Sequence, residues 1–112
     1  MKEISWSDFE KVEFRVGTIT EVKDFSEARK PAYKLFIDFG EDIGIKKSSA
    51  QITDHYQKED LKGKQIIAVI NFPPKQIGPF MSECLVTGLP DREGKVILIS
   101  PDQNVRNGVR LF

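Results

Sequence analysis

Few residues of this chain have the type and spacing that catalysis requires. The chain contains one histidine, His55, in a polar stretch, and one cysteine, Cys84, among apolar residues of a predicted strand. A nucleophile needs an adjacent base and an orienting group, so we expect His55 at the surface and Cys84 as a small buried side chain. Glycine motifs for phosphate and paired His or Cys motifs for metals are absent. The sequence therefore predicts a protein that is not an enzyme and has no metal and no cofactor.

Basic side chains are the second group that could do chemistry, because they can contact phosphate groups. They gather modestly at Arg29, Lys30, Lys34, Lys46, Lys47 and Lys75. Two interpretations are open: a patch that contacts phosphates, or an ordinary solvated surface whose field is weakened by Asp38, Glu41 and Asp42. The 17 Lys and Arg residues balance 17 Asp and Glu residues, so the net charge is zero. A nucleic-acid site would therefore have to be a local patch.

The segment 71–81, with the sequence NFPPKQIGPFM, is unusually apolar for a loop. It contains three prolines, and its large apolar side chains are Phe72, Ile77, Phe80 and Met81. Loops normally run over the surface, so these side chains either pack back on the domain or form an exposed patch for a partner. Prolines would order such a patch in advance and so reduce the entropy lost on binding.

Length and composition limit the rest of the molecule. The 112 residues suffice for one domain, spanning residues 1–112, because a second hydrophobic core would leave both halves too small. Every apolar run is far shorter than the roughly 20 residues of a membrane helix, which predicts no membrane insertion. The N-terminus lacks the basic start and apolar stretch of a signal peptide, so we expect a cytoplasmic protein.

Periodicity predicts the elements that position these residues. Trp6, Phe9 and Val12 share one face of a short N-terminal helix. Apolar side chains alternate along the predicted strands, and Gly17 indicates a bend or bulge in the first. The expected strands are 14–22, 33–39, 43–50, 65–72, 82–89 and 95–100, with a short helical connection in 51–61. Five or six short strands with a helix after the third are typical of the all-β OB-fold, a five-stranded Greek-key barrel, although the pattern alone leaves other small barrels open.

Five segments carry a family resemblance: FRVGTI (14–19), ARKPAYKL (28–35), KSSAQI (47–52), NFPPKQI (71–77) and SECLV (82–86). In this order and spacing they resemble the tRNA-binding-domain family of OB-fold proteins. The likeness is to its CsaA branch of secretion-related chaperones, and it runs from about Phe9 to Phe112. The resemblance implies a homodimer that binds unfolded precursor proteins and associates with the translocation motor SecA. In the wider family the ligand is tRNA.

The resemblance also implies where ligands and a second subunit bind. Family ligand contacts map onto Arg29, Lys30, Lys46, Ser48, Ser49, Asn71, Lys75, Ser82 and Glu83, and the apolar segment adds Phe80 and Met81. Strand 65–72 is apolar on both faces, so the face outside the barrel must be covered by a helix or a partner chain. The expected dimer interface is therefore Trp6, Phe9, Ile67, Val69 and Phe112.

Two functions remain open on this basis. A carboxylate at Glu83 would repel phosphate, whereas it would suit a peptide amide or a lysine. The zero net charge and the apolar segment point the same way. We therefore expect a non-enzymatic chaperone that binds unfolded precursor polypeptides in connection with protein export. The alternative is a tRNA-binding protein that recognises tRNA shape through the basic face of the barrel.

Overall fold

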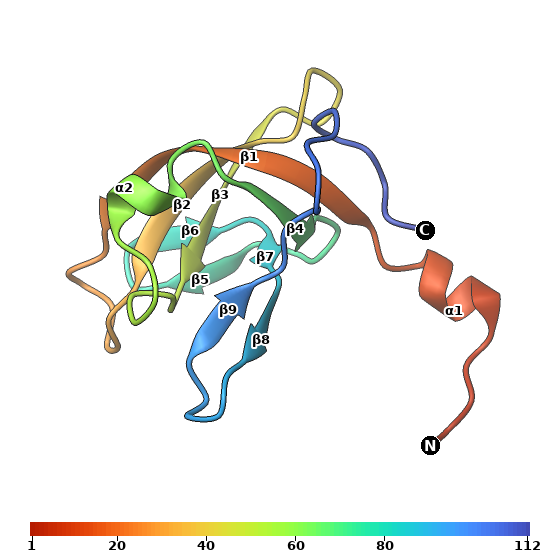
Figure 1. The fold of residues 1–112 in the computed structure, drawn as a ribbon, viewed down its shortest axis with the longest axis horizontal. Coiled ribbons are helices and arrows are strands. Elements are labelled where there is room, and N and C mark those ends of the chain that lie inside the picture. The colour runs from red at the N-terminus through yellow and green to blue at the C-terminus, as the bar shows by residue number, and fades with distance from the viewer.

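The computed structural model describes all 112 residues, and its centre is an antiparallel sheet that curls into a nearly closed barrel (Figure 1). The five strands lie in the order β3-β2-β1-β4-β7. They are β1 (Phe14–Asp24), β2 (Tyr33–Asp38), β3 (Ile45–Ala50), β4 (Gln65–Val69) and β7 (Leu85–Val86). A short helix, α1 (Trp6–Glu10), precedes the barrel, and α2 (Lys58–Leu61) follows β3. The predicted all-β OB-fold barrel with two short helices is confirmed.

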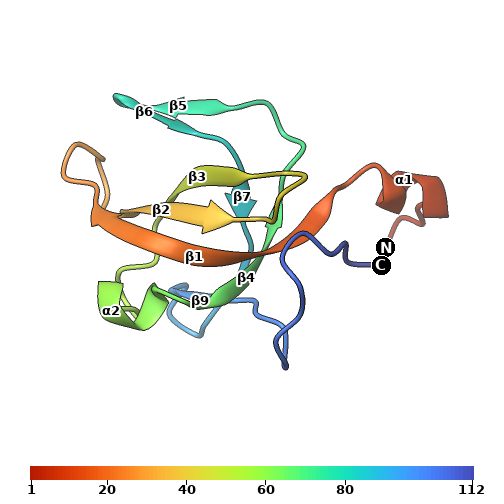
Figure 2. The same ribbon diagram turned by 90° about the horizontal axis from the view of Figure 1, so that it is seen from above.

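Two small hairpins complete the fold where the sequence predicted a loop and one continuous strand. The expected loop 71–81 contains β5 (Lys75–Ile77) and β6 (Phe80–Ser82), which pair with each other around a turn at Gly78, whose φ is +56°. In Figure 2 this hairpin stands apart from the sheet β1-β2-β3. The expected strand 82–89 is divided among the end of β6, β7 and β8 (Gly88–Pro90), and β8 pairs with β9 (Val96–Leu98). Both of these predictions were wrong.

The core is built around β2 because the side chains of this strand alternate strictly. Tyr33, Leu35, Ile37 and the following Phe39 are all buried, as their spacing predicted. They pack in one cluster with Leu61 of α2, which is fully buried. The helix after β3 therefore covers the barrel interior at one end.

The alternation in β1 changes at a bulge. Ile19 pairs with Ile37 and Glu21 pairs with Phe36, so Thr20 is an extra residue in β1. Ile19 and Val22 consequently both reach the core, which strict alternation would forbid. Gly17 was expected at the bend. The bulge lies beyond it, and Gly17 instead leaves room for the side chains of Ile37 and Phe39.

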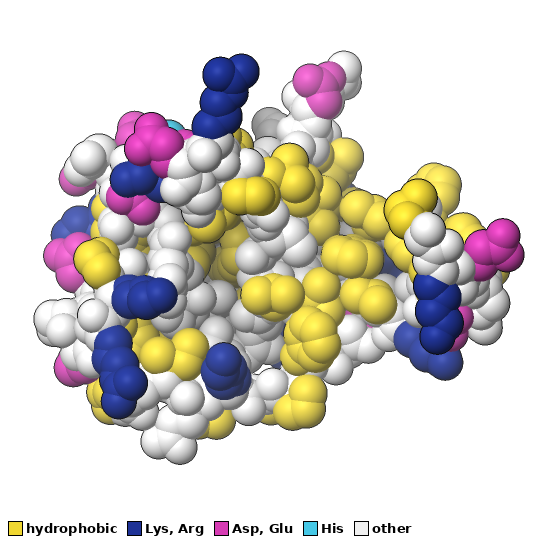
Figure 3. Space-filling view, turned by 90° about the horizontal axis from the view of Figure 1, so that it is seen from below, with side chains coloured by type: hydrophobic (Ala, Val, Ile, Leu, Met, Phe, Trp, Pro, Cys, Tyr) yellow, Lys and Arg dark blue, Asp and Glu magenta, His cyan; other side chains and the backbone are white.

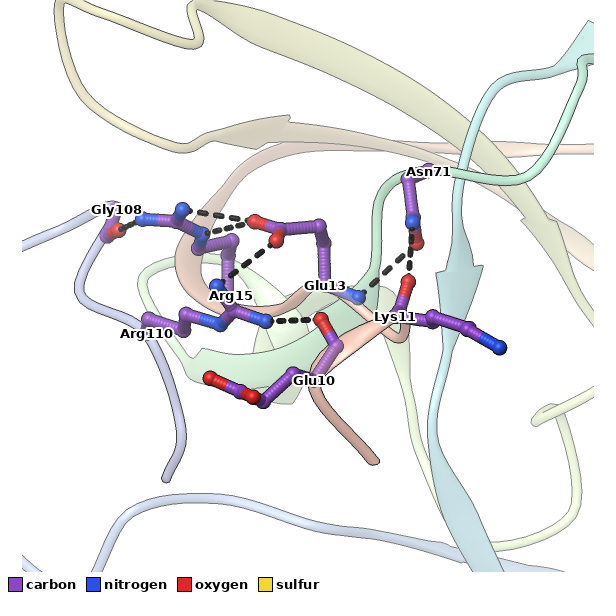
Figure 4. A network of polar contacts seen from close by, with 7 residues as sticks. All are labelled: Glu10, Lys11, Glu13, Arg15, Asn71, Gly108 and Arg110. Carbon is purple, nitrogen blue, oxygen red and sulfur yellow. Dashed lines mark hydrogen bonds and ion pairs between the residues drawn. The ribbon is translucent and has the colours of Figure 1, made fainter. Parts of the chain in front are cut away.

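Helix α1 stands off the barrel and is fastened through the residues that follow it (Figures 1 and 4). None of its residues is buried, and neither helix has the length and apolar character that a membrane crossing requires. The carboxylate of Glu13 lies 2.8 Å from Arg15 Nη2 and 3.0 Å from Arg110 Nη1. The hydrogen bond from Arg15 lowers the pKa of the Glu13 carboxyl, and the charge of Arg110 acts in the same direction. These contacts join the start of β1 to the C-terminal segment.

The close approach at Gly17 yields a first prediction. A Cβ at this position would lie 2.6 Å from Ile37 Cγ2 and 2.8 Å from Phe39 Cδ1. Because both neighbours are locked in the core, Gly17→Ala should lower the free energy of unfolding by about 1–3 kcal/mol in urea titrations. The exposed Glu21→Ala in the same strand should change it by less than about 0.5 kcal/mol. Equal stabilities for the two variants would contradict the close approach.

Candidate ligand-binding groove

The free edge of β3 is sealed by two side chains rather than by a long neighbouring strand. Ser82 Oγ accepts a hydrogen bond from the Ser49 N–H at 3.1 Å, and Glu83 Oε1 accepts one from the Lys47 N–H at 3.0 Å. The Glu83 N–H donates in turn to the Lys47 carbonyl at 2.8 Å. An unpaired strand edge invites pairing with another chain. Ser82 and Glu83 therefore protect this edge of the barrel as far as Ser49.

Cys84 and His55 have the structural surroundings that the sequence predicted for them. Cys84 is buried beside β3, and burial raises the pKa of its thiol to about 12, so the thiol is protonated at neutral pH. His55 is exposed, and its Nε2 lies 2.7 Å from Asp91 Oδ2, a hydrogen bond that lowers the pKa of the Asp91 carboxyl. No group of three or more His, Cys, Asp or Glu side chains is placed to hold a metal ion.

Three adjoining hollows begin beside Ser49 of β3, continue past the end of this strand and together form a groove. The first, of about 580 Å³, has an apolar part that consists of Phe72, Pro73, Ile77, Cys84 and Leu85. The second, of about 730 Å³, includes the basic residues Arg29, Lys30 and Lys75. The third, of about 290 Å³, lies against the β8–β9 turn and includes Lys30, Asp54 and Lys95. The first two hollows share four lining residues: Ser49, Gln51, Lys75 and Ile77.

The basic side chains in the middle of the groove have no carboxylate partner within the chain. They are exposed and absent from every ion pair of the structure: Arg29, Lys30 and Lys75. Two acids also line the groove, and each pairs with another lysine: Glu27 lies 4.0 Å from Lys34 Nζ and Asp54 lies 3.5 Å from Lys95 Nζ. The middle of the groove therefore carries a local positive charge although the net charge of the chain is zero.

The structure brings part of the predicted ligand site together. Of the predicted site residues, those that line the groove are Arg29, Lys30, Ser49, Lys75 and Ser82. Lys46 and Met81 lie outside it: Lys46 is opposite Ile37 in the sheet, and Met81 is opposite Gln76 in the hairpin. The carboxylate of Glu83 is turned toward the backbone of β3.

Two predicted ligand contacts need correction, because their side chains are buried. Ser48 is 1% exposed on the inner side of β3. Phe80 is 7% exposed and packs against Phe25, with 5.4 Å between the ring centroids, while Lys34 and Lys47 lie over its ring. Phe80 therefore fixes the β5–β6 hairpin to the barrel by packing inward, and it has no free face for a ligand.

Asn71, also expected to contact ligands, is occupied by the segment between α1 and β1. Its Oδ1 accepts from the Glu13 N–H at 3.0 Å, and its Nδ2 donates to the Lys11 carbonyl at 2.7 Å (Figure 4). The guanidinium of Arg110 donates to the carbonyl of Glu10 in the same network. Asn71 thus fastens the end of β4 to the residues after α1.

Several groove residues were not named individually as ligand contacts. Phe72 and Ile77 were predicted only as part of the apolar segment, which was expected to offer apolar contacts. Leu85 is 51% exposed next to buried Cys84, so strand alternation could have marked it as an outward apolar residue. Gln51 carries no such signal, because an isolated Gln is ordinary at a protein surface.

The residues expected at a dimer interface differ in exposure. Trp6 is 65% exposed and Phe112 is 99% exposed, while Phe9 and Ile67 are half-buried. Val69 is only 4% exposed in the single chain, so it has little surface to offer to a second copy. Figure 3 shows hydrophobic side chains gathered across one face of the molecule and continuing toward α1.

Comparison with known proteins identifies the family to which this chain belongs. The family model for the tRNA binding domain matches residues 14–110. The chain belongs to the tRNA-binding-domain family. A structure of the CsaA chaperone protein from Picrophilus torridus is 54% identical, with a TM-score of 0.92 over 98% of this chain and 100% of that chain. CsaA from Bacillus anthracis is 46% identical, with a TM-score of 0.91 over 99% and 100% of the two chains.

The family also includes domains of much larger enzymes. Methionine–tRNA ligase from Methanocaldococcus jannaschii is 31% identical over 111 residues, which are 99% of this chain and 17% of the ligase. The chain therefore spans about a sixth of the length of this relative. The resemblance to the CsaA branch, inferred from five sequence segments, is confirmed by the full-length similarity to two CsaA structures.

The hydrogen bonds along the β3 edge yield a second prediction, which tests the structural role of Glu83. Glu83→Ala removes the acceptor for the Lys47 N–H and should lower the free energy of unfolding by about 1–2 kcal/mol in urea titrations. Glu83→Gln keeps a side-chain oxygen that can accept this bond, so it should retain most of the stability. An Ala variant as stable as the unchanged protein would show that the seal does not depend on Glu83.

Proposed function

We propose that this chain is a non-catalytic chaperone that binds unfolded polypeptides in the groove along β3. The observation that carries the proposal is an exposed apolar wall beside unpaired cations, in a groove that is open at the surface. Phe72 is 55% exposed and Leu85 is 51% exposed, although each contributes to one hollow with Pro73. Apolar side chains gathered in a concave surface mark a binding site more often than scattered ones do.

The length of the groove suits an extended chain better than a compact ligand. Three connected hollows run from the proline-rich segment to the β8–β9 turn, and the largest has a volume of only about 730 Å³. An unfolded polypeptide can place successive side chains in successive hollows. The similarity to CsaA chaperones over their full length supports the same function.

We further propose that two copies associate through α1 and the C-terminus. Trp6 and Phe112 are large apolar side chains that a single chain leaves exposed, and Arg110 fastens the C-terminal segment to the residues beside α1. Burial of such side chains against a second copy would remove apolar surface from water. Unfolded precursor proteins in the cytoplasm are the proposed clients, in connection with protein export and with SecA as a further partner.

Binding of tRNA is the second candidate, and the unpaired cations of the groove favour it. Arg29, Lys30 and Lys75 could neutralise phosphates, and the family as a whole carries the tRNA binding domain. The position of Glu83 removes one argument against this candidate, because its carboxylate bonds to the β3 backbone instead of facing a ligand. Salt dependence distinguishes the two, since phosphate contacts weaken steeply as ionic strength rises.

The proposed function predicts that the apolar wall carries polypeptide affinity. A permanently unfolded protein, such as reduced and carboxymethylated lactalbumin, is labelled and titrated in fluorescence anisotropy. The double variant Phe72→Ser, Leu85→Ser should bind it about tenfold or more weakly, because each side chain loses a buried apolar contact. Ile45→Ser, at an exposed position outside the groove, should leave the affinity unchanged. Total tRNA that binds at physiological salt, while unfolded protein does not, would establish the second candidate instead.

The proposed dimer predicts that substitutions at its interface reduce the mass in solution while the barrel stays folded. Light scattering at micromolar concentration should give twice the mass of one chain for the unchanged protein. Trp6→Ser combined with Phe112→Ser should shift the mass toward one chain while the chain stays folded by circular dichroism, because neither side chain is buried in the single chain. Ile45→Ser should remain dimeric. A single-chain mass for the unchanged protein would exclude the dimer.

A further inference from the structure

Gln51 occupies the one place where all three hollows of the groove meet. It lines the apolar hollow with Phe72, the basic hollow with Arg29, and the hollow against the β8–β9 turn with Lys95. The apolar hollow and the third hollow share no other residue. A ligand that extends through the groove must therefore pass Gln51.

The polar atoms of Gln51 are free. The residue is exposed and follows directly on β3, and neither its backbone nor its amide side chain forms a hydrogen bond within the chain. The last N–H of the β3 edge that a side chain covers is that of Ser49, which bonds to Ser82 and lies two residues before Gln51. A side-chain amide has N–H donors and a C=O acceptor, and each peptide unit of an extended chain has one N–H donor and one C=O acceptor to match them. Gln51 thus suits a ligand main chain without regard to its sequence.

Side chains on either side of Gln51 differ sharply in character. Toward the proline-rich segment the groove offers Phe72 and Leu85, which are more than half exposed. Toward the loop before β2 it offers Arg29 and Lys30, which take part in no ion pair, and Lys75 lies between the two places because it lines both hollows. An apolar side chain is favoured at the first place, and an acidic side chain at the second.

We propose that the groove selects extended polypeptide segments in which an apolar side chain lies within a few residues of acidic side chains, with Gln51 contacting the main chain between them. This inference rests on the proposed function and adds a preference to it. A ligand with basic side chains at the second place would meet Arg29, Lys30 and Lys75 and be repelled. The preference should therefore depend on charge at that place and weaken as salt concentration rises.

The test uses fluorescein-labelled peptides of equal length in a Gly-Ser-Gln background. One carries a Leu pair followed by a Glu pair, a second replaces the Glu pair by Lys, a third replaces it by Gln, and a fourth keeps Glu but replaces Leu by Ser. Fluorescence anisotropy with the full chain should give the Leu–Glu peptide about tenfold or more tighter binding than the Leu–Lys peptide. The Leu–Gln peptide should lie between them, and the Ser–Glu peptide should bind weakly.

Variants assign the preference to the groove. Lys75→Glu and, separately, Arg29→Glu should abolish or reverse the preference for Glu over Lys, whereas Lys62→Glu, an exposed lysine outside the groove, should preserve it. Gln51→Ala should weaken the binding of every peptide by a similar factor, because it acts on the main chain. The unfolding midpoint of each variant confirms that it folds.

The outcomes separate this inference from the proposed function. Equal affinities for the Leu–Glu and Leu–Lys peptides would overturn the acidic preference and leave polypeptide binding intact. Failure of every Leu-bearing peptide to bind would overturn the proposed function, and the inference with it. Displacement of the Leu–Glu peptide by total tRNA, with tighter binding of the RNA than of any peptide at physiological salt, would assign the cations to phosphate and overturn the inference.

Discussion

The structure depends on how the edge of β3 is closed. A barrel must provide partners for the N–H and C=O groups of every strand edge, or leave an edge that pairs with other chains. Here β7 has only two residues, Leu85 and Val86, and it pairs with β4. The side chains of Ser82 and Glu83 therefore accept the hydrogen bonds of the Ser49 and Lys47 N–H groups. A long strand along β3 would fill the space that the groove occupies, so side-chain closure and the groove have a common origin.

The same closure determines what the apolar segment can offer. The β5–β6 hairpin can stand beside β3 because Phe80 anchors it to Phe25, in a small cluster separate from the main core. With Phe80 turned inward, Phe72 and Ile77 remain for the groove. The two alternatives that the sequence left open for this segment are therefore both realised, by different side chains. Phe80 packs back on the barrel and half-buried Ile77 packs against the same cluster, whereas Phe72 and Met81 are exposed.

Sequence periodicity predicted the parts of the fold in which one face of an element is buried and the other is not. Tyr33, Leu35 and Ile37 are the clearest case, since their period of two matches one-sided burial in β2. A bend or bulge was predicted in β1 at Gly17, but its position at Thr20 escaped prediction because an extra residue changes the register without changing the apparent alternation. Phe80 escaped because its neighbour Phe25 is far away in sequence, and only the folded chain brings the two rings together.

The residues of the candidate site were predictable to the extent that their chemistry is local. Arg29, Lys30 and Lys75 stand out by charge alone, and the structure places them together. The burial of Ser48 was not predicted, because its position in a family motif carries no information about which face of β3 it occupies. Gln51 owes its position to three segments that meet only in the fold.

Zero net charge proved to be a poor guide to the character of the site, for a physical reason. A sum over the chain counts paired and unpaired charges alike, whereas a ligand responds to those that lack a partner at close range. The acids in and near the groove have partners within the chain. Glu27 pairs with Lys34, Asp54 pairs with Lys95, and the carboxylate of Glu83 accepts a hydrogen bond from the backbone of β3. The cations between them are left free, so a neutral protein presents a positive groove. Because the apolar wall adjoins these cations, the groove has two chemistries within reach of one extended ligand, and an extended ligand is what a groove along an open strand edge accommodates.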